Sequence, residues 1–202
     1  MKIVCIGRNY ADHAKEMNAP LPTEPVFFMK PDTALLPPGT DFYIPDFTSD
    51  LHYECELVVK IKKVGKNIQV KFAGDYYEEV TLGIDFTARD LQTRCKEKSL
   101  PWEIAKAFDN SAPIGRFVNK ADINVADFQF YLKKNGEQVQ HGKSQDMIFA
   151  IDELIAYVSR FVTLKTGDLL FTGTPAGVGP VQIGDKLEAF LGTEKLLELA
   201  IK

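Results

Sequence analysis

Three acidic side chains in two separate segments could together bind a metal ion. Glu54 and Glu56 lie in His-Tyr-Glu-Cys-Glu-Leu (52–57), where polar and apolar residues alternate as in a strand. On one face of a strand, two like charges repel each other unless a cation lies between them. With Asp85 as a third carboxylate, the set favours a hard divalent ion, Mg²⁺ or Mn²⁺. The alternative is a solvated sheet face, and these residues alone do not choose between the two.

A histidine and a glutamate near the N-terminus have the spacing of an acid–base pair. Residues 9–17 predict a helix, on which His13 and Glu16, at i and i+3, share a face. A carboxylate bonded to an imidazole fixes the tautomer of the ring and raises its basicity, which suits a general base for water. The alternative is an ordinary surface pair on an amphipathic helix.

Two further segments are suited to an anionic ligand. Lys106 lies near Trp102 and Phe108, and an ammonium group near apolar walls is a good partner for an anion. A lysine that extends from a small amphipathic turn into water is the alternative. The glycine-rich segment 173–180 could form a nest of N–H groups beside the hydroxyl of Thr174. It lacks the lysine of a nucleotide-binding loop, and a wide turn between strands is the alternative.

The elements that must position these groups are mostly strands. Apolar runs and their alternation predict strands at 2–6, 26–29, 53–62, 68–72, 80–86, 128–133, 137–141, 169–172, 186–191 and 195–201. Helices are predicted at 9–17, 88–97 and 145–160. Thr87 and Asp90 give the second helix a start that resembles a capping box. Asn135-Gly136 and Gly192-Thr193 predict hairpin turns. Many strands with few helices predict an α+β fold dominated by sheet.

Composition narrows the class of protein further. A length of 202 residues predicts one domain, 1–202, and 45% hydrophobic residues can form its core without disulfides. The net charge is −4 and no basic run is present, so neither nucleic acid nor a membrane is an expected partner. Cys5, Cys55 and Cys95 lack metal-type spacing, which predicts reduced core thiols and a cytoplasmic location.

Taken together, the motifs resemble the fumarylacetoacetate hydrolase family, in particular its short acylpyruvase and oxaloacetate decarboxylase members. The segments that carry the resemblance are Gly-Arg-Asn-Tyr-Ala-Asp-His (7–13), Phe-Met-Lys-Pro-Asp-Thr (28–33), His-Tyr-Glu-Cys-Glu-Leu (52–57), Asp-Phe-Thr-Ala-Arg-Asp-Leu-Gln (85–92), Pro-Trp-Glu-Ile-Ala-Lys-Ala-Phe-Asp (101–109) and Phe-Thr-Gly-Thr-Pro-Ala-Gly-Val-Gly-Pro (171–180). The resemblance covers nearly the whole chain. It implies a mixed β-sandwich or β-roll with peripheral helices, usually as a homodimer.

The resemblance also implies a role for each candidate group. The acids that match the family's metal ligands, and would hold one Mg²⁺ or Mn²⁺, are Glu54, Glu56 and Asp85. His13 and Glu16 would activate a water molecule, on a segment that orders as a lid over the ligand. Lys106 would contact the substrate oxyanion. Contacts with the substrate or the pocket are implied for Arg8, Arg89, Gln92 and Thr174.

The substrate implied by the resemblance is a small 2-oxo acid. For an acylpyruvate, water activated by His13 and Glu16 would attack the distal carbonyl, and cleavage of a carbon–carbon bond would release pyruvate and a carboxylate. This metal-dependent hydrolysis is the predicted function. The alternative is oxaloacetate decarboxylation or 2-hydroxydienoate isomerisation, since the same site would stabilise the enolate. A non-catalytic metal-binding protein is a third interpretation, against which the dyad and Lys106 argue.

Overall fold

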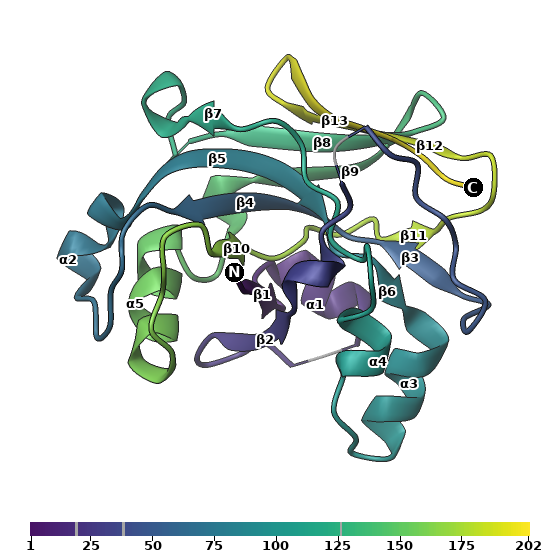
Figure 1. The fold of residues 1–202 in the computed structure, drawn as a ribbon, viewed down its shortest axis with the longest axis horizontal. Helices are drawn as coiled ribbons and strands as arrows, with labels where there is room; N and C mark the ends of the chain where they lie inside the picture. Colours follow the sequence, from purple (N-terminus) through teal and green to yellow (C-terminus); the bar gives the residue numbers. More distant parts are fainter. Residues whose placement is uncertain (19, 38, 126) are drawn as a thin grey trace.

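Three β-sheets and several short helices make up the protein (Figure 1). The structure is a computed structural model that describes residues 1–18, 20–37, 39–125 and 127–202. The largest sheet has the strand order β2 (Val26–Lys30), β1 (Ile3–Gly7), β10 (Leu169–Phe171), β4 (Cys55–Ile61), β5 (Tyr77–Ile84) and β7 (Val118–Asn119). Only the β1–β10 pair in this sheet is parallel among the described residues. The sheet is therefore mixed, and the predicted α+β, sheet-dominated fold is confirmed.

The other two sheets are antiparallel. The three-stranded sheet has the order β11 (Gly179–Pro180), β3 (Leu51–Tyr53) and β6 (Thr87–Ala88). The four-stranded sheet has the order β13 (Glu194–Ala200), β12 (Lys186–Leu191), β8 (Gln129–Lys134) and β9 (Glu137–Lys143). Both predicted hairpin turns are confirmed. In the turn between β8 and β9, Asn135 and Gly136 have φ of 54° and 86°, as a tight hairpin requires.

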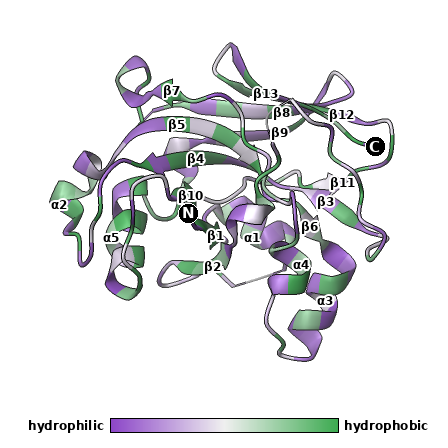
Figure 2. Cartoon of the chain, in the orientation of Figure 1, coloured by the Kyte–Doolittle hydropathy of each residue, from purple (hydrophilic) through white to green (hydrophobic). Residues whose placement is uncertain are grey.

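Alternate residues of β4 pack on opposite sides of the largest sheet. Cys55, Leu57 and Val59 belong to the main core, which includes residues of the four-stranded sheet such as Leu132. β4 and β5 contact β8, β12 and β13, so the two larger sheets stack face to face (Figure 1). Val58, on the other face of β4, belongs to a second apolar cluster. Figure 2 shows that β4 is mostly hydrophobic, so both of its faces are buried.

The predicted helices are present, with one large correction to their bounds. They are α1 (Ala11–Glu16), α3 (Arg89–Glu97) and α5 (Ile151–Phe161). The prediction of a helix from 145 was wrong, because residues 144–146 form a 3₁₀ turn and the backbone at Ala150 is extended. The N–H of Ala150 donates to Glu153 Oε2 (2.8 Å), and this bond marks the true start of α5.

Three other local predictions were wrong or incomplete. Residues 68–72 were predicted as a strand, but α2 (Val70–Ala73) packs on α5, and Ile68 N–H donates to Ser159 Oγ. α4 (Glu103–Lys106) was not predicted as a helix. The capping box is absent, since Ala88 precedes α3 and Asp90 accepts instead from the hydroxyl of Thr48. The remaining short turns are 3₁₀ helices at Asp32–Ala34, Gly74–Tyr76 and Lys120–Asp122.

Two expectations from composition can be compared with the structure. Cys5, Cys55 and Cys95 are free and buried, as predicted. Within the described ranges, no helix has both the length and the apolar character needed to cross a membrane.

Candidate active site

Glu54 and Asp85 lie where the chain passes from one sheet to another. β3 continues into β4 after a break at Glu54, and β5 continues into β6 after Asp85 and Phe86. Cys55 pairs with Ile84, so the two breaks are adjacent, and the N–H of Asp85 donates to the carbonyl of Glu54 (2.8 Å). The predicted continuous strand at 53–62 is therefore interrupted. The interruption places two acids from distant segments side by side.

The three predicted metal ligands form one buried cluster. Glu54, Glu56 and Asp85 each offer a carboxylate oxygen, and these oxygens lie within 4.8 Å of one another. The three residues are 6%, 2% and 1% exposed, which excludes a solvated sheet face. Three hard oxygen donors at this spacing fit a divalent metal ion. Burial of such a cluster is costly without cations, so its surroundings decide whether it is stable.

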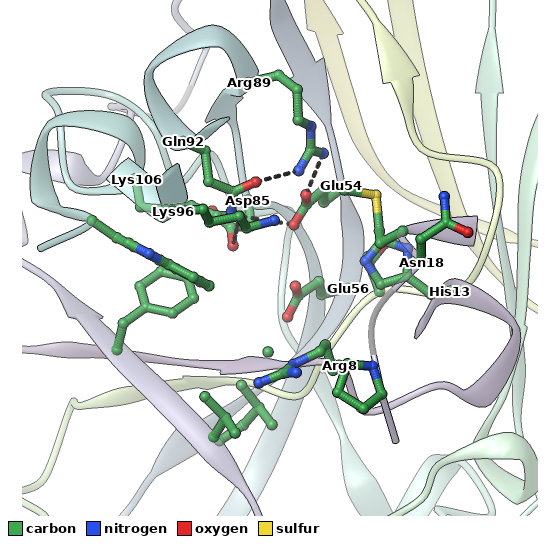
Figure 3. Close-up of a pocket in the computed structure, with 18 residues that line it drawn as sticks. Arg8, His13, Asn18, Glu54, Glu56, Asp85, Arg89, Gln92, Lys96 and Lys106 are labelled. Atoms are coloured by element: carbon green, nitrogen blue, oxygen red, sulfur yellow. Dashed lines mark hydrogen bonds and ion pairs between the residues drawn. The ribbon is translucent and has the colours of Figure 1, made fainter. Parts of the chain in front are cut away.

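Lys106 and Arg89 provide part of the positive charge that the cluster needs. The ammonium of Lys106, at the end of α4, lies 2.8 Å from Glu54 Oε2 and 2.8 Å from Asp85 Oδ2. Arg89 donates to Glu54 Oε1 (2.6 Å) and to Gln92 Oε1 (2.7 Å) (Figure 3). Helices α3 and α4 thus bring to the carboxylates the cationic groups that were expected to contact the substrate.

Lys30 is a third cation in this network, and its role was not predicted from the sequence. Its side chain is fully buried, and its ammonium lies 2.7 Å from Asp85 Oδ1. The same group donates to the carbonyl (2.8 Å) and hydroxyl (3.0 Å) of Ser111, whose hydroxyl donates to the carbonyl of Lys106. The sequence offered two signals: Lys30 lies in the segment 28–33 that carries part of the family resemblance, and it ends the apolar run 26–29, a pattern shared by many strands whose last residue reaches water.

The cations are unevenly distributed over the three acids. Burial raises the pKa of Glu54, but Lys106 and Arg89 outweigh burial and hold that pKa well below its usual range. Burial and repulsion by Asp85 and Glu54 raise the pKa of Glu56, which the N–H of Gly173 (2.7 Å) only partly offsets. Glu56 forms no ion pair with any described residue. A divalent ion between the three acids would supply the positive charge that Glu56 lacks.

The predicted acid–base pair is assembled. His13 Nδ1 lies 3.1 Å from Glu16 Oε2, and Glu16 accepts a hydrogen bond from the N–H of Gly177 (3.1 Å). A carboxylate only accepts, so Nδ1 carries the proton and Nε2 of the neutral ring is the acceptor. Gly177 has φ of 97°, and a Cβ there would lie 2.1 Å from the carbonyl of Val139. The glycine is therefore required where the loop meets Glu16.

Asn9 anchors the start of α1, and this role was also not predicted from the sequence. It is fully buried, donates to the carbonyls of Thr172 (2.8 Å) and Phe149 (3.0 Å), and accepts from the N–H of Phe149 (2.8 Å). These bonds tie the segment that carries His13 and Glu16 to the end of β10 and to the residues that precede α5. The dyad is thereby held beside the strand that precedes the glycine-rich loop.

The glycine-rich loop does not form a free anion nest. The N–H groups of Gly173 and Gly177 bind the protein's own carboxylates, Glu56 and Glu16. The hydroxyl of Thr174 donates to the carbonyl of Cys55 (2.8 Å) and accepts from the side chain of Gln140 (2.8 Å). Thr174 therefore holds the loop against β4, and its hydroxyl is already engaged on both sides.

A pocket of about 380 Å³ connects these groups. Its lining includes nearly all the predicted site residues: Arg8, His13, Glu54, Glu56, Asp85, Arg89, Gln92, Lys106 and Thr174. Glu16 is not part of the lining and contacts the lining residue His13 instead. Phe28 and Trp102, with ring centroids 6.0 Å apart, form an apolar wall, and Lys96 also borders the space. Figure 3 shows the charged side chains gathered around Glu54 and Glu56.

The fold and the pocket define a class of protein: an α+β enzyme whose buried carboxylates suit a divalent metal. The family model described as "Fumarylacetoacetate (FAA) hydrolase C-terminal" matches residues 2–201. The chain therefore belongs to the fumarylacetoacetate hydrolase family, and the resemblance found in the sequence is confirmed.

Individual relatives support this assignment. Over 188 residues, 93% of this chain and 85% of the relative, the chain is 48% identical to "Oxaloacetate tautomerase FAHD1, mitochondrial" of Mus musculus. It is 44% identical to "Oxaloacetate decarboxylase, mitochondrial" of Dictyostelium discoideum, over 93% of this chain and 87% of that protein. A solved structure of fumarylpyruvate hydrolase from Pseudomonas aeruginosa, in complex with Mn²⁺ and pyruvate, has a TM-score of 0.93 and 38% identity, covering 100% of this chain and 89% of that one.

Proposed function

We propose that the protein acts on small 2-oxo acids that carry a second carbonyl or carboxyl group at C4. The leading candidate substrate is oxaloacetate. The names of the two curated relatives support oxaloacetate, and the relative bound to Mn²⁺ and pyruvate supports a 2-oxo acid beside a metal. The observation that carries the proposal is the position of the His13–Glu16 pair, whose imidazole borders the same pocket as the carboxylate cluster.

The carboxylates Glu54, Glu56 and Asp85 would hold Mg²⁺ or Mn²⁺, since both ions prefer oxygen ligands. When bound, the metal supplies Lewis-acid stabilisation of the negative charge that develops on the 2-oxo group. Lys106 is held by two of these acids and directs its ammonium at the pocket. A fixed cation in a buried site stabilises a developing anion more than a mobile one in water does.

His13 is the group that moves the proton. Nε2 of the neutral imidazole accepts a proton from C3 of oxaloacetate, and Glu16 stabilises the imidazolium that results. The electrons of the C3–H bond form the enolate, and the proton returns to the oxygen on C2. The keto acid becomes its enol with no change in composition, and the reverse transfer restores the keto form.

Hydrolysis of acylpyruvates is the second candidate, and the same dyad favours it. His13 would take a proton from water, and the hydroxide would attack C4 of the substrate. The C3–C4 bond then breaks, and one fragment leaves as a carboxylic acid, which loses its proton to solvent and becomes the carboxylate. The pyruvate enolate takes the proton from His13 at C3. Both reactions need a base, but only hydrolysis needs one strong enough to deprotonate water.

Enzyme assays on oxaloacetate and acetylpyruvate test both candidates. With Mg²⁺, we expect faster interconversion of keto and enol oxaloacetate, followed by the absorbance of the enol, and EDTA should abolish it. Glu16→Gln should lower acetylpyruvate hydrolysis about 10²-fold or more, and tautomerisation less, because water is the weaker acid. Asp12→Asn, an exposed acid on the same helix, is the matched control. If the protein binds metal but accelerates neither reaction, the proposed function is wrong.

A further inference from the structure

The cations around the pocket fall into two groups. Lys106 and Arg89 are paired with carboxylates of the cluster, as described above. Arg8 and Lys96 also border the pocket, yet neither forms an ion pair with any residue in the described parts of the chain. A substrate contact at Arg8 was expected from the family resemblance. Lys96 had no assigned role, and its unbalanced charge requires an explanation.

Lys96 belongs to a stripe of α3 that faces the pocket. Arg89, Gln92 and Lys96 follow at i, i+3 and i+7 on this helix, so they share one face, and all three border the pocket. Lys96 lies in the last turn and is exposed although it borders the pocket, so we take it to lie where the pocket meets solvent. Its ammonium lies 5.7 Å from the ring centroid of Trp102, which directs the side chain along the apolar wall.

The surroundings of Lys96 are predominantly positive. Partial burial lowers the pKa of Lys96, and the neighbouring charges of Arg89, Lys106 and Arg8 lower it further, against the attraction of Glu54. Three cations and one carboxylate are therefore the charges that act on Lys96. An anion at the mouth of the pocket would relieve this repulsion.

We infer that Lys96 is a specificity-determining residue that binds the distal carboxylate of a dicarboxylic 2-oxo acid. The inference rests on the proposed function, because it assumes that the 2-oxo carboxylate end of the substrate lies at the cluster. A monocarboxylic acylpyruvate has no second anionic group. Oxaloacetate has one at C4, farther from the cluster and nearer the mouth, where Lys96 lies. Its long side chain and unpaired charge suit an anion at a variable distance.

Kinetics of Lys96→Met on two substrates test this role. Methionine keeps the apolar stem of the side chain but removes the charge. We expect KM for oxaloacetate to rise about three- to tenfold with little change in kcat, and both constants for acetylpyruvate to stay within about twofold. Lys96→Arg should restore most of the affinity for oxaloacetate. Lys98→Met removes an exposed lysine nearby that is not part of the pocket lining. It should therefore leave KM and kcat unchanged for both substrates.

Equal effects of Lys96→Met on both substrates, or no effect on either, would overturn the inference. Binding of unreactive acids separates this outcome from failure of the proposed function. We expect calorimetry with Mg²⁺ to show that wild type binds 2-oxoglutarate more tightly than pyruvate, and that Lys96→Met removes the difference. That result supports the role of Lys96 even if neither substrate is turned over. A wild type without such a preference for 2-oxoglutarate contradicts it.

Discussion

The same residue types have very different surroundings in the two larger sheets. In the four-stranded sheet, Lys195 lies 2.9 Å from Glu188, and Lys186 lies 2.9 Å from Glu198, on a face open to water. Just before β4 of the largest sheet, Glu54 lies 2.8 Å from Lys106 of α4, with side-chain exposures of only 8% and 3%. The distances are alike, but the first group is screened by solvent and the second is not.

This difference decides what each group of charges can do. An exposed pair contributes little to stability, because water and salt weaken it and two long side chains must be ordered. A buried pair is costly to form and strongly destabilising to break, since removal of one partner leaves an uncompensated charge. The buried network also holds three carboxylate oxygens close enough together to suit a divalent metal. Four substitutions test the contrast, from the largest expected effect to the smallest.

Asp85→Asn should have the largest effect. It removes a carboxylate predicted to bind the metal and leaves both Lys30 and Lys106 with less negative charge around them. We expect Mg²⁺ binding to become undetectable by calorimetry. Turnover should fall by more than about 10²-fold. Loss of a residue that only hydrogen-bonds to a metal ligand already lowers metal affinity or activity about 10- to 100-fold. Glu198→Gln in β13 is the control and should bind metal as wild type does. Unchanged affinity in Asp85→Asn would remove Asp85 from the metal site.

Lys30→Met tests the buried side of the comparison by stability. Without this ammonium, Asp85 Oδ1 loses its ion-pair partner inside the protein. We expect the free energy of unfolding, measured by urea denaturation in EDTA, to fall by about 3 kcal/mol. Lys60→Met is the matched control, because Lys60 pairs with Glu79 at 2.7 Å on the exposed part of the same sheet. It should cost less than about 1 kcal/mol. Equal losses in the two variants would contradict the comparison.

The exposed sheet was largely predictable from the sequence, whereas the buried site was predictable only in part. Side chains along the strands of the four-stranded sheet alternate between core and water, and a turn that contains glycine connects the two strands of each hairpin. Local sequence pattern was therefore sufficient to predict this sheet. The acids of the site were found because charged residues within an apolar run are unusual. The break at Glu54 was not found, since it depends on pairing between β3 and β6, which lie far apart in sequence.

The residues whose structural roles were not predicted have one property in common. Lys30 contacts Ser111, Asn9 contacts Thr172 and Gln140 contacts the N–H of Cys55, each more than 50 positions away, and no local pattern encodes such contacts. The strand predicted at 68–72 failed for the same reason, because packing against α5 overrides the local preference. Sequence pattern identified the chemical groups, and the tertiary contacts that tune them required the structure.

The expected loss of stability for Asp90→Asn is smaller than that for Lys30→Met and larger than that for Lys195→Met. Burial raises the pKa of Asp90, but hydrogen bonds from Thr48 (2.6 Å) and the N–H groups of Ser49 (3.0 Å) and Leu91 (2.8 Å) outweigh burial and hold that pKa below its usual value. A lowered pKa in the folded state stabilises the protein above the unfolded pKa and is lost as pH falls through the folded one. We expect a loss of about 1 kcal/mol at neutral pH, shrinking below about pH 4.

The measurement is the free energy of unfolding of wild type and of Asp90→Asn, from urea denaturation between neutral pH and below about pH 4. Asp12→Asn controls for the change in net charge, because Asp12 is largely exposed and, among the described residues, forms an ion pair with Lys15 alone. A difference between wild type and Asp90→Asn that stays constant down to the lowest pH would show that the charge of Asp90 is not what stabilises the loop before β3.

Lys195→Met should have the smallest effect. Lys195 lies beside both Glu188 and Glu198, and its hydrogen bonds to them lower the pKa of each carboxylate. These bonds form in water, so the unfolding midpoint of Lys195→Met should match that of wild type within replicate scatter at physiological salt. A clear loss of stability, removed by high salt, would show that the exposed network acts as a unit. Burial would then not be what separates the two sheets, and the large effect expected for Lys30→Met would need another explanation.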